Sequence, residues 1–467
     1  MTKVKEKTSP KLAFGYGMGE VANQMSWYMI NNYLTLFYTD VVTLSANAIS
    51  LIMLIARVWD AVNDPIMGSI CDKTNTRWGK FRPYLFFAPP FLAIFNILTF
   101  TVWPVQGVAK VVLCLVTYIG TGMLYTVIGT AHGALVNVIA IDSQVRMNLS
   151  TARGIGSAII SFILSAIVTP MILFFSKSDT ANGKGYLGAS IVLSCLMIPC
   201  FIVEAMICKE TYTDRLHSAS IENAQKNRGF FASLKELCKN DQLLRIVIST
   251  LFGAICVTAR MSLLTYYVIY VVGNYMLISA VFSVMTAAQF IGTLLIPFAT
   301  KKFGKKNYML ILSGLMITGF IGIFFFGKNI PVLLGLSFLC GLCNSSGALS
   351  YGMVSDCIEY GAWKLGTRQE GLAASFLSLA VKISTAFCGV AGVQCLALVG
   401  YVPNAEQSAS TITGISFVVN IIPAICGVLS VLPLFGYKLT EKFVGEIRAD
   451  LEERENKETE REGVVHE

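Results

Sequence analysis

Long apolar runs alternate with short polar connections along most of the chain. A helix needs about 20 apolar residues to cross the hydrocarbon core of a bilayer. Twelve runs come close to this length, and they begin near Leu12, Ser45, Pro83, Val108, Gly154, Gly185, Leu243, Tyr275, Asn307, Pro331, Gly371 and Ser410. The pattern therefore predicts an all-α membrane protein with twelve transmembrane helices.

The first, fourth and seventh runs are less uniformly apolar than the others. Glycine, asparagine, serine, threonine and tyrosine interrupt them. Helices of this composition more often line a water-filled cavity than face lipid. We therefore expect these three helices to face a wet cavity.

The longest polar connection lies at the midpoint of the chain and divides the runs into two sets of six. Arg77-Trp78-Gly79-Lys80 after the second run is echoed by Lys302-Phe303-Gly304-Lys305 after the eighth. Parallel six-helix halves with substrate between them are one established transporter plan. The sequence thus predicts a cytoplasmic N-terminus (1–11), an N-terminal six-helix bundle (12–208), a cytoplasmic middle loop (209–242), a C-terminal six-helix bundle (243–437) and a cytoplasmic tail (438–467).

Composition agrees with a membrane location and excludes an ordinary soluble protein. Hydrophobic residues make up 54% of the 467 residues and charged residues only 14%, whereas soluble proteins carry about 25% charged residues. Most of the 13 cysteines lie in apolar runs, where cysteine packs as a small hydrophobic side chain. A disulfide framework is therefore not expected.

The net charge of +8 reflects an uneven distribution of lysine and arginine. These residues concentrate in the N-terminus and the even-numbered connections, whereas the other connections have only Lys110, Lys177, Lys184 and Lys328. The positive-inside rule then places both termini and all even-numbered connections in the cytoplasm. No nucleic-acid partner is needed to explain the charge.

Two carboxylates, Asp60 and Asp64, lie inside the second apolar run. A charged side chain at bilayer depth costs roughly 3 kcal/mol or more and usually has a function or a partner. Residues four apart share a helix face, so Asp60, Asn63 and Asp64 can offer oxygens to one small cation. The alternative is a structural ion pair with Arg57 or Lys382. An ion site, with Na⁺ possible at Asp60 and Asp64, is the leading hypothesis.

Seven short segments resemble one transporter family when they are taken in order along the chain. They are Phe14–Glu20, Tyr38–Val42, Arg57–Pro65, Thr76–Pro83, Arg146–Arg153, Asp356–Lys364 and Gly400–Asn404. In this order they resemble the glycoside–pentoside–hexuronide:cation symporters, a branch of the major facilitator superfamily that includes melibiose permease. The resemblance covers about Leu12 to Tyr437 and implies the major facilitator fold.

The resemblance implies two sites, which we carry over residue by residue. The implied cation site consists of Asp60, Asn63, Asp64 and Thr126. The substrate-binding candidates are Glu20, Asn23, Trp27, Tyr125, Gly129, His132, Arg153, Arg260 and Lys382. Among these, Glu20 matches an acidic sugar ligand, and Trp27 matches an aromatic position suited to stacking on a pyranose.

The fourth run departs from melibiose permease in ways that affect the sugar site. Gly129 stands where that protein has an acidic sugar ligand, and Gly133 stands where an aromatic residue follows one turn later. Arg260 ahead of Tyr266 and Tyr267 resembles the pentoside and glucuronide branch more closely. Melibiose is therefore not the expected substrate, and the identity of the sugar stays open.

Several candidates have a second interpretation. Glu20 is either a sugar ligand or a carboxylic acid held neutral by burial, and Lys382 is either a functional group or charge balance for the acids. His132 is either a packed, hydrogen-bonded residue or a substrate contact. Arg260 either anchors an anionic substrate or pairs with a neighbouring acid.

A further set of charged residues lies at the expected cytoplasmic ends of the helices. We interpret these as helix caps and as salt bridges that break when the carrier changes state. The gating candidates are Arg77, Lys80, Arg82, Asp356, Glu359 and Arg368.

Taken together, the sequence favours a cation-coupled (Na⁺ or H⁺) symporter of a glycoside, pentoside or hexuronide in a bacterial-type inner membrane. The expected partners are the sugar, a monovalent cation and membrane lipid, with the monomer as the functional form and no cofactor. A carrier of a lysolipid or drug-like amphiphile on the same scaffold is the alternative. A membrane enzyme is disfavoured because only three histidines are present.

Overall fold

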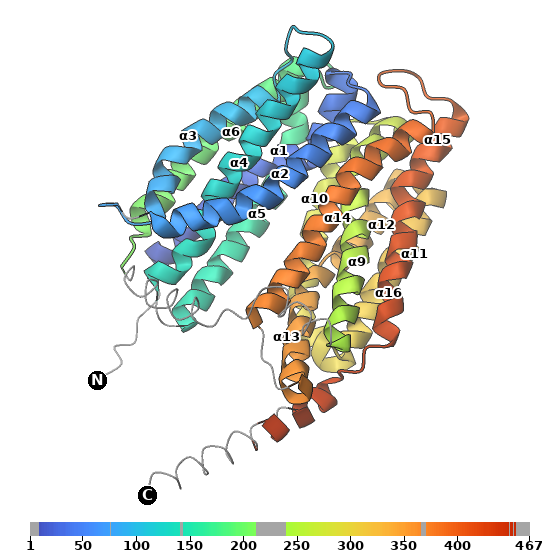
Figure 1. Ribbon diagram of the computed structural model, residues 1–467. Coiled ribbons are helices and arrows are strands. Elements are labelled where there is room, and N and C mark those ends of the chain that lie inside the picture. Colours follow the sequence, from blue (N-terminus) through green and yellow to red (C-terminus); the bar gives the residue numbers. More distant parts are fainter. Residues whose placement is uncertain are drawn as a thin grey trace, which may run out of the picture. The chain divides into compact units, whose positions relative to one another are not determined.

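The computed structural model describes residues 9–74, 76–140, 143–211, 240–365, 370–447, 449–451 and 453. These residues form helices, and within them no β-strand appears beyond the isolated bridge between Thr76 and Gly79. The early helices are α1 (Pro10–Leu36) with the π-helical turn η1 (Phe37–Val41), α2 (Ala46–Lys73), α3 (Arg82–Thr99), α4 (Val108–Ile139), α5 (Ser143–Ser176) and α6 (Gly183–Ile207). All of them appear in Figure 1.

The later helices follow the middle connection. They are α9 (Asp241–Tyr266) with the π-helical turn η2 (Tyr267–Val272), α10 (Met276–Phe303), α11 (Lys305–Phe326), α12 (Ile330–Cys343), α13 (Ser346–Leu365), α14 (Glu370–Leu398), α15 (Ala409–Ser416), η3 (Phe417–Ile421) and α16 (Ile422–Phe435). The predicted all-α class is confirmed.

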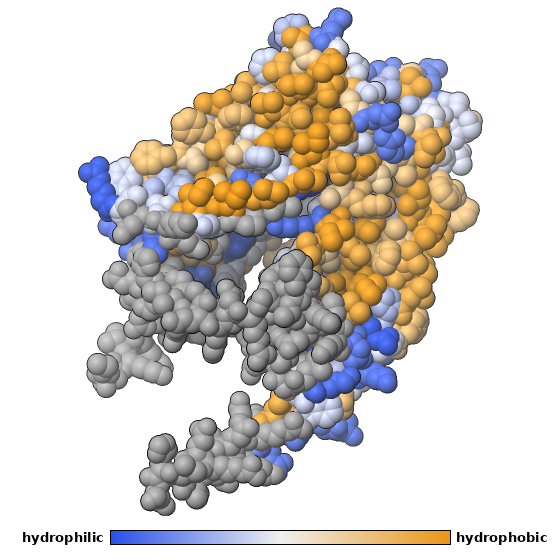
Figure 2. Space-filling model, in the orientation of Figure 1, coloured by the Kyte–Doolittle hydropathy of each residue, from blue (hydrophilic) through white to orange (hydrophobic). Residues whose placement is uncertain are grey.

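The described helices provide twelve segments that account for the twelve predicted spans. Ten segments are long and apolar enough to cross a membrane, and α12–α13 and α15–α16 each count as one segment. Helices α1 and α3 complete the twelve. Side chains on the outer faces of the helices include exposed Phe87, Phe174 and Phe298, and Figure 2 shows hydrophobic residues covering the sides of the helices in that view. Such a surface suits contact with lipid.

The described residues divide into two compact units. Unit 1 contains Met1–Lys226, Ser262–Thr286 and Gly389–Ile415, and unit 2 contains Asn227–Met261, Ala287–Cys388 and Ser416–Glu467. Unit 1 therefore combines the first six helices with two segments of the predicted C-terminal bundle. The predicted division into bundles of six helices stays a prediction.

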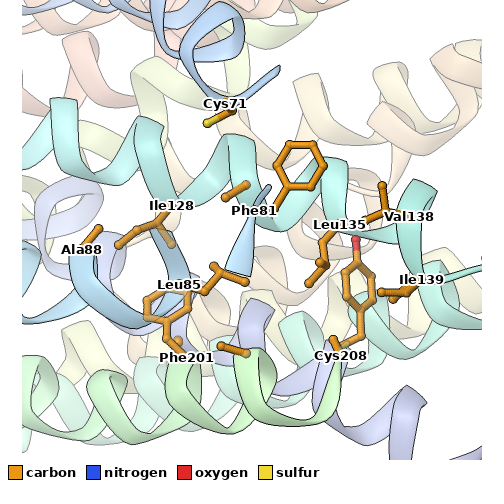
Figure 3. Close-up of a cluster of buried hydrophobic side chains, with 14 of the residues drawn as sticks. Cys71, Phe81, Leu85, Ala88, Ile128, Leu135, Val138, Ile139, Phe201 and Cys208 are labelled. Carbon is orange, nitrogen blue, oxygen red and sulfur yellow. The ribbon is translucent and has the colours of Figure 1, made fainter. Parts of the chain in front are cut away.

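In unit 1, α1 packs against α5 and α6, and α3 packs against α4 and α6. Leu85 of α3, Ile128 and Leu135 of α4 and Phe201 of α6 belong to the hydrophobic core between these helices (Figure 3). In unit 2, α11 packs against α12 and α16. The core of unit 1 thus holds α1, α4 and α6 together, and these helices carry several of the candidate residues.

A hydrogen-bonded cluster around Asp40 joins the two later segments of unit 1 to the end of α1. Tyr270 donates to Asp40 Oδ2 at 2.6 Å, and Tyr401 donates to Asp40 Oδ1. Asn404 donates to the backbone carbonyl of Asp40, and the hydroxyls of Thr39 and Tyr266 lie 2.8 Å apart. Two of the segments that resemble the transporter family, Tyr38–Val42 and Gly400–Asn404, are therefore in contact.

The sequence repeat has a structural counterpart in each unit. Gly79 and Gly304 both have positive φ, +111° and +78°, a conformation that glycine adopts without steric cost. Each glycine precedes a helix whose first N–H groups meet a carboxylate. Glu210 accepts from the N–H groups of residues 80–82 at 2.7–2.9 Å, and Glu441 accepts from the N–H of Lys305.

Candidate cation and substrate sites

Helix α2 presents the candidate cation ligands to α4. Thr126 of α4 donates from Oγ1 to Asp64 Oδ1 at 3.1 Å, and a Cβ at Gly122, one turn earlier, would lie 3.1 Å from Asp60 Oδ1. Asn63 is only 4% exposed. Asp60 and Asp64 therefore both lie along the α2–α4 contact, with Thr126 opposite Asp64 and the buried Asn63 on the same helix.

The alternative that the sequence offered for Asp60 is also present. Arg57 Nη1 lies 3.5 Å from Asp60 Oδ2, one turn away on the same helix, and both side chains are about a quarter exposed. Asp64 is instead held by a neutral hydroxyl.

The donor set suits a hard cation better than a soft transition metal. Within the described ranges, no group of three His, Cys, Asp or Glu side chains comes together to hold a metal ion. Carboxylate, amide and hydroxyl oxygens are hard ligands, which favour hard cations. The buried Asn63 amide nitrogen has no hydrogen-bond partner among the described residues. Because this nitrogen is a donor, it indicates a water or another acceptor and is not evidence for a cation, which would need the amide oxygen.

Glu20 of α1 lies at the centre of the candidate substrate residues. Arg153 of α5 donates from Nε to Glu20 Oε2 at 2.6 Å, and Gln24 donates to Glu20 Oε1 at 3.2 Å. Gln24 also donates to Ser157 at 2.9 Å. These bonds fix the carboxylate between α1 and α5.

His132 of α4 is completely buried, and its surroundings differ from a simple substrate contact. Its Nδ1 lies 2.5 Å from Glu204 Oε1 of α6 and its Nε2 lies 3.4 Å from Glu20 Oε2. The ring stacks on Tyr16 with centroids 4.7 Å apart. The structure thus supports the hydrogen-bonded interpretation of His132, while contact with substrate stays a prediction.

The remaining substrate candidates of unit 1 lie on α1 and α4. They include two aromatic side chains, a buried amide and a glycine with open space beside it. Trp27 and Tyr125 stack with ring centroids 4.3 Å apart. A Cβ at Gly129 would meet nothing within 4 Å. Asn23 is buried, and its Oδ1 has no hydrogen-bond partner among the described residues. An aromatic face, an open glycine and a buried amide are suited to a small polyhydroxylated ligand.

Two substrate candidates belong to unit 2 and are described with it. Arg260 of α9 is buried, donates to Asn420 Oδ1 and lies 4.8 Å over the ring of Phe320. Lys382 of α14 is exposed in this unit. Their roles toward substrate stay predictions.

Several of the gating candidates have a partner within their own unit. Arg82 donates to the carbonyl of Ala205 at 2.7 Å, Lys80 is buried, and Arg77 lies over the ring of Trp78. In unit 2, Asp356 pairs with Lys305 at 2.6 Å, and Glu359 is partly buried. Arg368 lies outside the described residues, and gating by these groups stays a prediction.

Glu204 is the most informative residue that the sequence interpretation missed. It lies in the sixth apolar run, so the criterion that singled out Asp60 and Asp64 applied to it equally. Its partnership with His132 depends on the packing of both α4 and α6 against α1 and α3 and has no local sequence signal. Lys305, the partner of Asp356, entered the sequence interpretation only through the internal repeat and the positive cytoplasmic charge.

The chain matches known transporters over nearly its whole length. A family model described as MFS/sugar transport protein matches residues 15–441. The isoprimeverose transporter of Lactiplantibacillus pentosus is 29% identical over 94% of this chain and 91% of that protein. The glucuronide carrier protein homolog of Escherichia coli (strain K12) is 29% identical over 96% of this chain and 97% of that protein.

Solved structures agree with this assignment at the level of the fold. The crystal structure of a D-xylose-proton symporter superposes with a TM-score of 0.65 at 12% identity, over 92% of this chain and 98% of that chain. Together with the twelve helical segments, these matches show that the chain belongs to the MFS/sugar transport family, in its glycoside–pentoside–hexuronide symporter branch.

Proposed function

We propose that the protein moves a sugar or glycoside across the membrane together with a cation, Na⁺ or H⁺, by alternating access. The observation that carries this proposal is the contact between α2 and α4, in which Thr126 donates to Asp64. Asp60 and Asn63 lie on the same helix as Asp64. Two carboxylates inside an apolar helix are explained economically by a cation that neutralises them during transport.

Coupling needs each ligand to raise the affinity for the other by the same factor. Helix α4 offers a direct connection, because Thr126 of the candidate cation site is adjacent in sequence to Tyr125, which stacks on Trp27. A cation that draws Asp64 and Thr126 together would therefore also order the aromatic face of the substrate site.

The substrate class follows from the donor set and from the relatives. Glu20 accepts hydrogen bonds, as a sugar hydroxyl requires, and Arg153 suits either a hydroxyl or a carboxylate. One relative is named for isoprimeverose and another for a glucuronide. Pentosides and hexuronides are therefore the first compounds to test, and a lysolipid or drug-like amphiphile is the alternative cargo.

The cellular setting is part of the same proposal. We place the chain in the inner membrane with both termini in the cytoplasm, because lysine and arginine concentrate in the even-numbered connections. We expect it to contact lipid and to work as a monomer.

Counterflow into proteoliposomes tests the substrate class. Vesicles of the full chain are loaded with a methyl β-D-xyloside, β-D-glucoside or β-D-glucuronide, and uptake of the labelled compound from outside is followed. Exchange of at least one of these compounds supports the proposal. No exchange of any of these sugars, together with exchange of a labelled lysophospholipid in vesicles loaded with that lipid, would favour the amphiphile carrier.

A further inference from the structure

A second cluster of ionisable groups, separate from the α2 carboxylates, lies where α1, α4, α5 and α6 meet. It consists of Glu20, His132, Arg153 and Glu204, one residue from each helix. His132 and Glu204 are both 0% exposed. The imidazole lies between two carboxylates, 2.5 Å from Glu204 and 3.4 Å from Glu20.

One oxygen of this cluster lacks a partner. Glu204 Oε2 is buried and has no hydrogen-bond partner among the described residues, and the contact between His132 Nε2 and Glu20 lacks hydrogen-bond geometry. A buried carboxylate oxygen that stays unpaired costs more than one that is bonded. A proton on that oxygen would remove the negative charge of this buried carboxylate, which is costly in a low-dielectric site.

The net charge of the cluster also indicates that it binds a proton. With a neutral imidazole, two carboxylates face one guanidinium, so the cluster carries one uncompensated negative charge in a buried site. Such a charge is costly in low dielectric. One proton, on His132 or shared with Glu204, makes the cluster neutral.

Arg153 gives this cluster a connection to the substrate site. Its side chain is 45% exposed, whereas the Glu20 side chain that it pairs with is only 9% exposed. A solute that attracts the guanidinium away from Glu20 leaves a negative charge behind in the buried part. A second proton is then needed to restore neutrality, and proton uptake becomes linked to solute binding.

We propose that Glu20, His132 and Glu204 form a proton-binding site that Arg153 links to the transported solute. This inference rests on the proposed function and specifies H⁺ as a coupling ion bound away from Asp60 and Asp64. The other titratable and charged groups that face the cluster are Tyr16 on α1, Tyr125 on α4, Cys208 after α6, and Arg82 of α3, which faces Cys208. The alternative is an inert ion-pair network that only holds the four helices together.

Proton movement measured beside solute uptake separates these possibilities. Full-length protein is reconstituted into vesicles that contain a pH-sensitive dye, in sodium-free buffer, and methyl β-D-xyloside or methyl β-D-glucuronide is added outside. For the wild type we expect the interior to acidify as solute enters. The variant Arg153→Gln removes the guanidinium that the solute is proposed to attract away from Glu20, and Glu406→Gln, at an exposed loop position, is the control.

The readout is the number of protons moved per solute. We expect Arg153→Gln to lower this ratio by about fivefold or more, because the charge of the buried groups then no longer changes when solute binds, while Glu406→Gln leaves it unchanged. A network with a purely structural role predicts that uptake and proton movement fall together at constant ratio, which would overturn the proposal.

If the variant does not fold, measurements on the wild-type protein alone still test the proposed proton site. Solute uptake driven by a Na⁺ gradient with no proton movement overturns the proton site and leaves the proposed function standing. If no sugar crosses under any gradient, both are overturned.

Discussion

At the residue scale, three polar pairs link the helices of unit 1. Asp64 meets Thr126, Glu20 meets Arg153, and His132 meets Glu204. A charge left alone at bilayer depth would cost roughly 3 kcal/mol or more. Each pair therefore fixes a helix contact, and each is a point where binding of an ion or solute can change the packing.

Removal of a single carboxylate from α2 should separate the two acids by role. We expect Asp64→Cys to abolish cation-driven accumulation of the sugar, because the carboxylate that meets Thr126 is lost. Asp60→Cys should lose the stimulation of sugar binding by cation. Both effects are measured in proteoliposomes, with Asp179→Cys, at an exposed loop position, as the control. Unchanged cation dependence in both variants would remove the site from these residues.

Gly19 should be intolerant of a side chain because Glu204 covers it. A Cβ at this position would overlap the Glu204 carboxylate. We expect Gly19→Ala to lower the free energy of unfolding by about 1–3 kcal/mol through overpacking. The control Gly314→Ala has open space around its Cβ and should be neutral or slightly stabilising. Thermal unfolding of detergent-solubilised protein compares the two, and equal stability of the Gly19 and Gly314 variants would contradict the contact.

The sequence revealed the acids of this region but not their partners. Asp60, Asp64 and Glu20 stand out because charge is rare in apolar runs, and Glu204 could have been recognised on the same ground. The contact of His132 with Glu204 joins residues of α4 and α6. Such a contact arises from helix packing, which a local hydrophobic pattern does not encode.

At the element scale, hydrophobic runs predicted the helices closely. Eleven of the twelve predicted starts lie within two residues of an observed start, for example Tyr275 against Met276. The exception is α5, which begins at Ser143 and not near Gly154. Its first turns contain polar residues such as Arg146 and Asn148, so the apolar run marked only the part expected to lie in lipid. The π-helical turns were not predicted, because their period differs too little from 3.6 over five or six residues.

The carboxylates that cap α3 and α11 should stabilise the two units in the same way. Glu210 and Glu441 accept from backbone N–H groups at these helix starts, where the helix dipole also favours negative charge. We expect Glu210→Ala and Glu441→Ala each to lower the free energy of unfolding by about 1 kcal/mol. The control Glu446→Ala, at an exposed position, should change nothing. If neither Glu210→Ala nor Glu441→Ala lowered the free energy of unfolding, the equivalence of the two capping sites would be contradicted.

At the scale of the whole molecule, the Asp40 cluster connects segments that are far apart in the sequence. Burial and the nearby Asp40 carboxylate raise the pKa of Tyr401, so its hydroxyl stays protonated and continues to donate. If the carrier alternates as proposed, residues 262–286 and 389–415 separate from the end of α1 once in each cycle. The cluster is then a set of hydrogen bonds that must break and form again.

Weakening this cluster should change the rate of transport more than the affinity for solute. Asp40→Asn replaces a charged acceptor with a neutral one, and hydrogen bonds to charged groups are roughly twice as strong as neutral ones. We expect an altered initial rate of uptake with solute binding within about twofold of the wild type. Tyr351→Phe, on an exposed tyrosine, is the control. A change confined to solute affinity would contradict this interpretation of the cluster.

The most direct measurement follows the accumulation of a transported sugar in proteoliposomes under imposed ion gradients. Vesicles of the full chain receive an inward Na⁺ gradient, an inward H⁺ gradient, or no gradient. Coupling through buried acid groups predicts accumulation above equilibrium with at least one gradient and simple equilibration without any. Equal final sugar levels under all three conditions would contradict cation-coupled transport.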